Sequence, residues 1–191
     1  SLLADQVLKK NPGRKIVFDV KCSSKLKESI IKSKGIPVMA RTGHSFIKKE
    51  ILNQNAILGG EMSGHIFYND DWYGFDDGIY SALRLIEIIS DSESSSSEIF
   101  NKFPQLFNTP EINIVTTDER KFKIIERLKK DFEFNGFEKV LIDGIRLEND
   151  ISWGLARASN TTPSLVFRFE GESKEALKEI IEVFQKALLV I

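Results

Sequence analysis

The sequence predicts an α/β layer domain followed by an α+β domain. In the first half, a β-branched and aromatic run at Lys15–Val20 is followed by a helical pattern at Lys25–Ser33, and this alternation continues. Alternating strands and helices are typical of a layered α/β sandwich. The second half instead combines two long helical patterns with a hairpin sequence. The turn sequence Phe107–Pro110 separates the halves, so we expect domains at 1–107 and 108–191.

The first domain begins with the end of a helix at residues 2–10, which Asn11-Pro12-Gly13 stops. Asp76 and Asp77 are interpreted as charges at the N-terminus of a later helix. That helix carries its apolar residues on one face: Ile79, Leu83, Ile86 and Ile89. The elements expected between these two helices are the strand Lys15–Val20, a helix at Lys25–Ser33, a strand at Pro37–Ala40, a helix at Ser45–Gln54 and a short apolar run at Ala56–Leu58.

A polar run at Asp91–Glu98 is expected to be a solvated loop in which Ser97 caps the next helix. In the second domain, Asp143-Gly144 lies between two apolar runs within Val140–Leu147, which is a hairpin signal. Its other expected elements are a strand at Glu111–Thr116, a helix at Asp118–Phe132 with Phe122, Ile125, Leu128 and Phe132 inward, a half-buried strand with Leu165, Phe167 and Phe169 on one face, and a helix at Ser173–Leu188.

The composition excludes several classes of function and partner. The 191 residues contain 27 basic and 28 acidic side chains, so the net charge of −1 argues against a nucleic-acid partner. A single cysteine, Cys22, excludes an internal disulfide and favours the reducing cytoplasm. No apolar run approaches the ~18 residues that span a bilayer, so no membrane partner is expected. Because the chain begins at Ser1 without Met, we expect it to be a piece of a longer protein.

The first polar loop reads Gly59-Gly60-Glu61-Met62-Ser63-Gly64-His65. Its glycine spacing resembles a nucleotide P-loop, but His65 stands where that loop needs Lys. A carboxylate can accept two sugar hydroxyls at once, and Ser63 adds another polar partner. Glycines on either side allow close approach of the backbone. The alternative is a glycine-rich turn whose Glu61 and Ser63 only cap a nearby helix.

The second polar loop reads Arg157-Ala158-Ser159-Asn160-Thr161-Thr162. A guanidinium binds phosphate through two hydrogen bonds, and hydroxyls and backbone N–H groups complete such a site. The alternative is a turn closed by serine and threonine side chains between two strands. Together, the two loops indicate a sugar phosphate, with its hydroxyls at Glu61 and its phosphate at Arg157. This hypothesis requires that both side chains face a common cleft.

Lys21, His44 and His65 lie at expected strand or loop ends, where α/β proteins gather functional groups. Metal binding is not expected, because the chain has no HExxH motif and no cysteine pair. Four aspartates also lack the spacing of a calcium loop: Asp70, Asp71, Asp76 and Asp77.

With these residues and with Thr42-Gly43-His44 and Phe75-Asp76-Asp77-Gly78, the chain resembles the α-D-phosphohexomutases, and in particular their bacterial phosphomannomutase/phosphoglucomutase branch. The resemblance implies an α/β domain followed by a TATA-binding-protein-like sheet with helices on one face. It implies interconversion of mannose or glucose 1- and 6-phosphates through a bisphosphorylated sugar. Its site residues here would be Lys21 and His65 as candidate general acid and base, His44, Glu61 and Ser63 as sugar contacts, and Arg157, Ser159, Asn160 and Thr161 as phosphate ligands.

The resemblance covers only the third and fourth domains of that four-domain family. The family's phosphoserine loop and Mg²⁺ loop have no counterpart in this sequence. It follows that Mg²⁺ and the phosphoserine belong to the missing N-terminal domains, and that this chain alone is not expected to turn over. Two alternatives stay open, namely a non-catalytic sugar-phosphate-binding or regulatory module and a half-enzyme completed by a separate chain.

Overall fold

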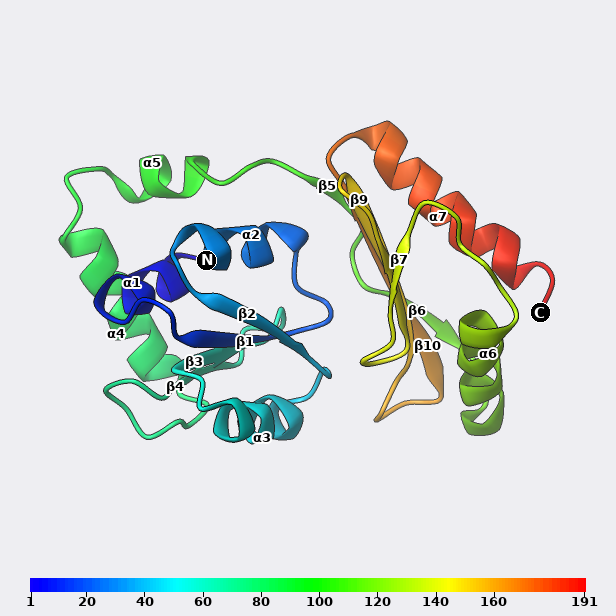
Figure 1. Ribbon diagram of the computed structural model, residues 1–191, viewed down its shortest axis with the longest axis horizontal. Helices are drawn as coiled ribbons and strands as arrows, with labels where there is room; N and C mark the ends of the chain where they lie inside the picture. Colours follow the sequence, from blue (N-terminus) through cyan, green and yellow to red (C-terminus); the bar gives the residue numbers. More distant parts are fainter. The chain divides into compact units, whose positions relative to one another are not determined.

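The computed structural model describes residues 1–191, and the chain divides into two compact units, Ser1–Pro104 and Gln105–Ile191 (Figure 1). Both are mixed α and β, the first layered and the second α+β, as the sequence predicts. The short strand β5 (Phe107–Asn108) lies at the boundary expected from the sequence. It pairs with β10 (Ser164–Gly171), so it belongs to the second unit.

The first unit is built on a four-stranded sheet in the order β2-β1-β3-β4. β1 runs parallel to β2 and β3, whereas β3 and β4 are antiparallel. The strands are β1 (Lys15–Asp19), β2 (Ile36–Ala40), β3 (Leu58–Gly60) and β4 (Ile66–Tyr68). The helices are α1 (Leu2–Lys10), α2 (Ser24–Lys32), α3 (His44–Gln54), α4 (Gly78–Ser90) and α5 (Ser96–Asn101).

Helices cover both faces of this sheet (Figure 1). On one face, Ile16 and Phe18 of β1 pack with Val7 and Leu8 of α1 and with Ile30 of α2. On the other face, Val17 packs against α3 through Ile47 and Ile51. A strand buried on both faces reads as a continuous apolar run, which explains the sequence of β1.

The apolar face of α4 points outward. Ile79, Leu83 and Ile86 are 79%, 58% and 56% exposed, while Arg84 is buried. The Arg84 guanidinium lies over the Tyr68 ring, with its carbon 4.8 Å from the ring centroid, and its Nε donates to Gln6 of α1. The helix therefore joins its unit through polar and aromatic contacts, and the apolar stripe expected from the sequence is left on the surface.

The cap of α5 differs from the sequence prediction. Ser95, rather than Ser97, caps this helix, because its Oγ accepts from the Glu98 N–H while the Glu98 carboxylate accepts from the Ser95 N–H. This reciprocal pair is a capping box, and it fixes the start of the helix at Ser96.

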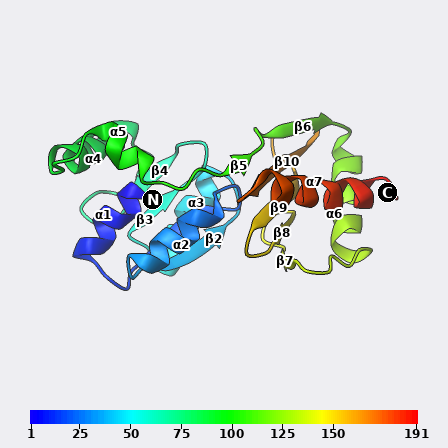
Figure 2. The same cartoon turned by 90° about the horizontal axis from the view of Figure 1, so that it is seen from above.

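The second unit is an antiparallel sheet in the order β5-β10-β9-β8-β7, with β6 also paired to β10. The helices α6 and α7 pack against one face of it, around a core that includes Leu128, Phe167 and Phe184 (Figure 2). The remaining strands are β6 (Ile112–Val115), β7 (Glu138–Val140), β8 (Ile145–Glu148) and β9 (Ser152–Ala158), and the helices are α6 (Asp118–Lys130) and α7 (Lys174–Leu188).

Two details of this unit differ from the sequence prediction. Phe122, expected to point inward, is 55% exposed, and the Lys121 ammonium lies 5.2 Å from its ring centroid. Val166 alternates with Leu165 and Phe167 along the strand predicted to be half-buried, yet it is buried too. It lies in the middle of the sheet, between β9 and β6, where neighbouring strands flank it on both sides.

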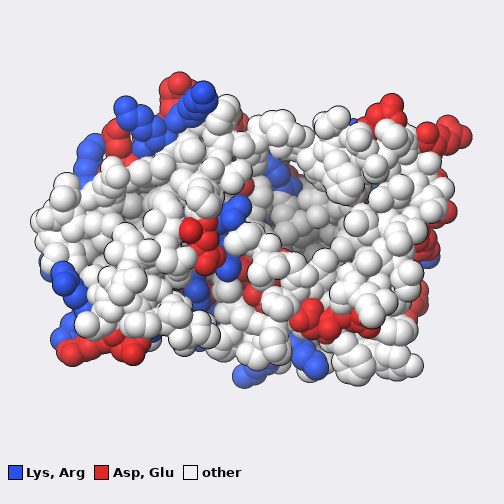
Figure 3. Space-filling model, turned by 180° about the vertical axis from the view of Figure 1, so that it is seen from behind, with Lys and Arg blue, Asp and Glu red and all other residues white.

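The surface carries mixed charge. On the face seen in Figure 3, Lys and Arg atoms are interspersed with Asp and Glu atoms and form no continuous basic field. None of the helices has the length and apolar character needed to cross a bilayer.

Candidate functional site

The polar residues of the first unit gather at one edge of its sheet. Lys21 follows β1, His44 opens α3 just after β2, and Glu61 follows β3. Since β1 is parallel to both neighbours, their carboxyl ends meet at the same edge. The His44 and His65 rings lie with centroids 6.1 Å apart, and the charges of Lys21 and His65 both act on Glu61. The structure therefore brings four of the predicted site residues together.

Glu61 has one carboxylate oxygen without a hydrogen-bond partner. Its Oε2 accepts from the Gly43 N–H at 3.2 Å, whereas the buried Oε1 has no hydrogen-bond partner. The side chain is only 9% exposed. Burial raises the pKa of Glu61, and the neighbouring Asp19 carboxylate raises it further. A hydroxyl donor at Oε1 would satisfy this acceptor and support its charge.

The loop after Glu61 is a tight turn that presents His65. The Glu61 N–H donates to the His65 carbonyl at 2.9 Å, and Gly64 adopts a φ of +95° that favours glycine. His65 Nδ1 lies 2.6 Å from Asp76 Oδ2. Ser63 is exposed at the turn, beside Gly64. The hydrogen bonds within this loop leave the hydroxyl of Ser63 and the ring of His65 at the surface.

Asp76 is a site residue that the sequence interpretation assigned wrongly. Only Asp77 acts as a helix N-terminal group, because its side chain accepts from the Tyr80 N–H. Asp76 instead pairs with His65 and so orients its ring. A carboxylate on Nδ1 leaves Nε2 as the nitrogen that faces other partners.

Asp19 is a second residue that sequence reasoning missed. It is fully buried at the end of β1, where it accepts from the Met62 N–H, the Thr42 hydroxyl and the Cys22 thiol. These bonds tie the loop at His44 to the loop at Glu61. A signal was present, because a carboxylate that ends an apolar strand is rarely buried without partners.

Arg157 lies inside β9 and not in the loop that the sequence suggested. It is 5% exposed, and its Nε donates to Asp143 Oδ2 at 2.9 Å. Asp143 is held there by the β7–β8 turn, in which Gly144 has a φ of +76°. A Cβ on Gly144 would lie 2.2 Å from the Ala156 carbonyl oxygen, so the turn needs glycine to approach β9. Sequence reasoning found this hairpin but not that it would place Asp143 on Arg157.

The loop after Arg157 closes on the buried Ser159. Its Oγ accepts from the Thr162 N–H at 3.2 Å and from the Thr162 hydroxyl at 2.8 Å. Asn160 and Thr161 are exposed, and the Asn160 N–H makes no hydrogen bond within the chain. The loop is thus a serine-closed turn, and its outer side offers donor groups. That Glu61 and Arg157 reach one ligand stays a prediction.

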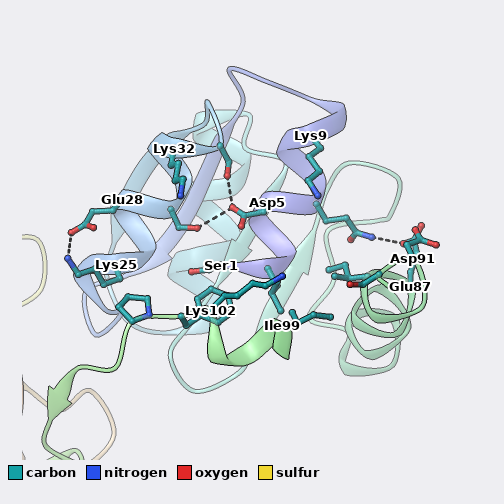
Figure 4. A pocket seen from close by; sticks show the side chains of 18 of the residues that line it. Ser1, Asp5, Lys9, Lys25, Glu28, Lys32, Glu87, Asp91, Ile99 and Lys102 are labelled. Atoms are coloured by element: carbon teal, nitrogen blue, oxygen red, sulfur yellow. Dashed lines mark hydrogen bonds and ion pairs between the residues drawn. The ribbon is translucent and has the colours of Figure 1, made fainter. Parts of the chain in front are cut away.

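A hollow of about 900 Å³ in the first unit contains none of the predicted site residues. It lies among α1, α2, α4 and α5 (Figure 4). Some of its polar groups already have partners, because Ser29 and Ser33 donate to Asp5 and Lys25 pairs with Glu28. Elsewhere in the chain, no group of three or more His, Cys, Asp or Glu side chains could hold a metal ion.

Comparison with known proteins gives two adjoining matches. Residues 1–107 match the model of phosphoglucomutase/phosphomannomutase, alpha/beta/alpha domain III, and residues 111–187 match that of the phosphoglucomutase/phosphomannomutase C-terminal domain. A phosphomannomutase/phosphoglucomutase of Pseudomonas syringae pv. tomato is 52% identical, covering 98% of this chain and 40% of the relative. One of Pseudomonas aeruginosa is 48% identical, covering 100% of this chain and 41% of the relative.

Solved structures agree with these matches. A phosphoglucomutase/phosphomannomutase family protein from Burkholderia thailandensis superposes with a TM-score of 0.92 at 44% identity, covering 98% of this chain and 40% of that one. An N-acetylglucosamine-phosphate mutase in its substrate complex superposes with a TM-score of 0.67 at 14% identity, a likeness of fold alone. The chain spans about 40% of the length of the relatives it matches.

Proposed function

The chain belongs to the phosphoglucomutase/phosphomannomutase family, and from this premise we propose that it is the substrate-recognition half of a hexose-phosphate mutase. The whole enzyme would interconvert hexose 1-phosphate and hexose 6-phosphate, with mannose or glucose as the sugar, through a bisphosphorylated sugar. The alternative, a sugar-phosphate-binding module without catalysis, has no observation of its own in favour.

The observation that carries the proposal is the unpaired oxygen of Glu61. A buried carboxylate oxygen without a donor is costly, and a sugar hydroxyl supplies the missing hydrogen bond. Ser63 and His44 lie exposed beside it and can bind further hydroxyls. The same oxygen would not attract a phosphate, because like charges repel.

The phosphate is assigned to the second unit. Arg157 is held by Asp143 through its Nε, which leaves its two terminal nitrogens as donors for phosphate oxygens. The Asn160 N–H, the Thr161 hydroxyl and Ser159 complete the proposed anion site. Each of these groups is a donor or can act as one, which is the complement of the acceptor at Glu61.

We propose Lys21 and His65 as the groups that transfer a proton to or from the substrate, or that balance the charge on its reacting oxygen. His65 is oriented by Asp76, so its Nε2 is the nitrogen available to a sugar oxygen. Lys21 is 8% exposed and its positive charge acts on Glu61. A cation there would stabilise negative charge that develops on a reacting oxygen.

The chain holds no ligand set for Mg²⁺, and we assign that ion and the phosphorylated serine to the N-terminal domains that the relatives possess and this chain does not span. Mg²⁺ would neutralise charge on the phosphoryl group during transfer. The chain alone is therefore expected to bind substrate without turning it over. We place the activity in the cytoplasm, where the free thiol of Cys22 stays reduced.

Binding is tested by titrating the chain with mannose 1-phosphate and glucose 1-phosphate, following backbone amide shifts. Shifts are expected at Gly43, Glu61 and Asn160, with and without Mg²⁺. Arg157→Ala should lose roughly 1.5–3 kcal/mol of binding, the usual worth of hydrogen bonds to a charged group. Lys178→Ala, at an exposed lysine of α7, is the matched control and should bind as the wild type does.

Three results would reject the proposal: no amide shift at either loop, equal affinity of the Arg157→Ala protein, or an equal loss in the control. Turnover is tested separately with a coupled assay of glucose 6-phosphate formation. The chain alone should show none, and measurable turnover without another protein would contradict the assignment of the chemistry to missing domains.

A further inference from the structure

The ammonium of Lys121 lies beneath the loop of Ser159 and is almost completely enclosed. The residue is 3% exposed although it sits in the first turns of α6. Its Nζ donates to the Ser159 carbonyl at 2.8 Å and to the Thr162 carbonyl at 2.9 Å. It also lies 2.7 Å from Asp118 Oδ1. All three N–H donors of the ammonium therefore have acceptors.

A lysine is seldom buried at this level, and here backbone carbonyls of one loop compensate for the burial. Two of its three acceptors are the carbonyls at the start and the end of one four-residue loop. The third partner, Asp118, is 78% exposed, so it adds little to the burial. The ring of Phe122 covers the ammonium at 5.2 Å, which accounts for an aromatic residue at an exposed position of α6.

The direction of the Ser159 carbonyl decides where the next amide points. In a trans peptide the C=O and the following N–H point in opposite directions, and the chain contains no cis peptide. Because Lys121 draws the Ser159 carbonyl inward, the Asn160 N–H is turned outward. That N–H makes no hydrogen bond within the chain and lies in the exposed part of the loop.

We propose that Lys121 is the positioning residue of the phosphate loop: it anchors the carbonyls of Ser159 and Thr162 and thereby aims the Asn160 N–H at an anion. This proposal rests on the function proposed above. Lys121 does not touch the anion in this account. Its ammonium orients the loop and adds positive charge behind it. The exposed donors of the loop lie between this ammonium and the anion.

The test uses Lys121→Met, which keeps the length and the apolar stem of the side chain but has no donors. Without ligand, hydrogen exchange of the Thr162 amide, which donates to Ser159 Oγ, should accelerate at least tenfold relative to amides in the core of α7. With inorganic phosphate as the probe, the affinity read from the Asn160 amide shift should fall about tenfold, the size found when groups that orient metal ligands are removed.

Asp118→Asn is the matched control, because it removes the charge of the exposed partner of Lys121 and leaves both carbonyl bonds in place. Its loop exchange and its phosphate affinity should equal those of the wild type. A Lys121→Met protein that is less stable overall, but whose Thr162 exchange and phosphate response match the wild type, would overturn the proposal. So would a control that loosens the loop to the same degree.

A measurement on the wild type needs no variant. The Nζ protons of Lys121 should exchange slowly with water and give an observable ammonium resonance, and fast exchange overturns the proposal. If the wild type gives no phosphate shift while Lys121→Met still loosens the loop, the positioning of the loop is supported and the phosphate function is rejected. The two hypotheses can thus fail separately.

Discussion

In the first unit the loop at Glu61 leaves a buried acceptor open, whereas in the second unit the loop at Ser159 leaves an exposed donor open. The first loop is tied to its sheet through the buried carboxylate of Asp19. The second is anchored by the buried ammonium of Lys121. Each loop is thus held in place by hydrogen bonds to one buried ionisable side chain.

The opposite polarity of the two loops has a chemical consequence. An open carboxylate oxygen accepts from neutral hydroxyls and disfavours anions, while outward N–H groups and a guanidinium favour anions. The proposed sugar phosphate carries both kinds of group, hydroxyls for the first loop and a negative phosphate for the second.

The largest expected effect is on the charge pair that holds Arg157. Asp143→Ala should lower the free energy of unfolding of the second unit by about 3–5 kcal/mol, because it leaves a guanidinium buried without its carboxylate. Urea unfolding followed by tryptophan fluorescence measures the change, with Trp153 reporting on this unit and Trp72 on the first. Asp118→Ala, at a 78% exposed carboxylate, should change stability by less than about 1 kcal/mol. Equal effects of the two variants would mean that Arg157 is not held as a buried pair.

The two neighbouring glycines of β3 are expected to behave differently. A Cβ on Gly59 would lie 2.4 Å from Ile51 Cδ1, so Gly59→Ala should cost about 1–3 kcal/mol of stability through overpacking against α3. A Cβ on Gly60 would lie 3.6 Å from the His65 carbonyl oxygen, an ordinary contact, so Gly60→Ala should change stability by less than about 0.5 kcal/mol. Thermal unfolding of the two variants measures this difference.

The two glycine variants also distinguish two explanations for glycine at these positions, namely packing against α3 and close approach of a ligand. The sequence analysis assigned to the glycines on either side of Glu61 the role of letting the backbone approach a ligand, whereas the structure places Gly59 against α3. If Gly59→Ala folds with unchanged stability and instead weakens sugar-phosphate binding, the packing explanation is wrong.

Periodicity predicted most elements because each is decided by local burial. The run Lys15–Asp19 has apolar neighbours on both faces, and the pattern at Lys174–Leu188 buries one stripe, so both are found where expected. The apolar stripe of α4 also follows the helical period, but it lies at the surface. A period states which residues share a face and not which face meets the core.

The predicted site residues are those proposed to contact a ligand. The missed residues instead hold the loops and side chains of the site in place. Asp19, Asp143 and Lys121 contact groups between 14 and 43 residues away in the sequence. No local pattern encodes such contacts, because they depend on strand pairing and on helix docking. The polar loops could therefore be recognised from the sequence and predicted Glu61 and Arg157. The residues that hold these loops could be identified only from the three-dimensional fold.

The smallest expected effect, and the one that sharpens the contrast between the loops, concerns the charge of Glu61. Burial and the nearby Asp19 raise the pKa of Glu61 in the folded state above its unfolded value of about 4.3. The folded state therefore binds this proton more tightly. Its stabilising contribution is present below the unfolded pKa and is lost as the pH rises through the folded pKa.

Glu61→Gln removes that titration while keeping an oxygen for the Gly43 N–H. The variant should be more stable than the wild type at pH 7, and the difference should disappear below about pH 4, where both side chains are neutral. Urea unfolding at several pH values measures this, and amide titration with mannose 1-phosphate should show weaker binding by the same variant. A variant that is less stable at pH 7 would mean that Oε1 already has a partner, and the first loop would then offer no unpaired acceptor. Because stability and binding are expected to change in opposite directions, a general loss of structure cannot produce this result.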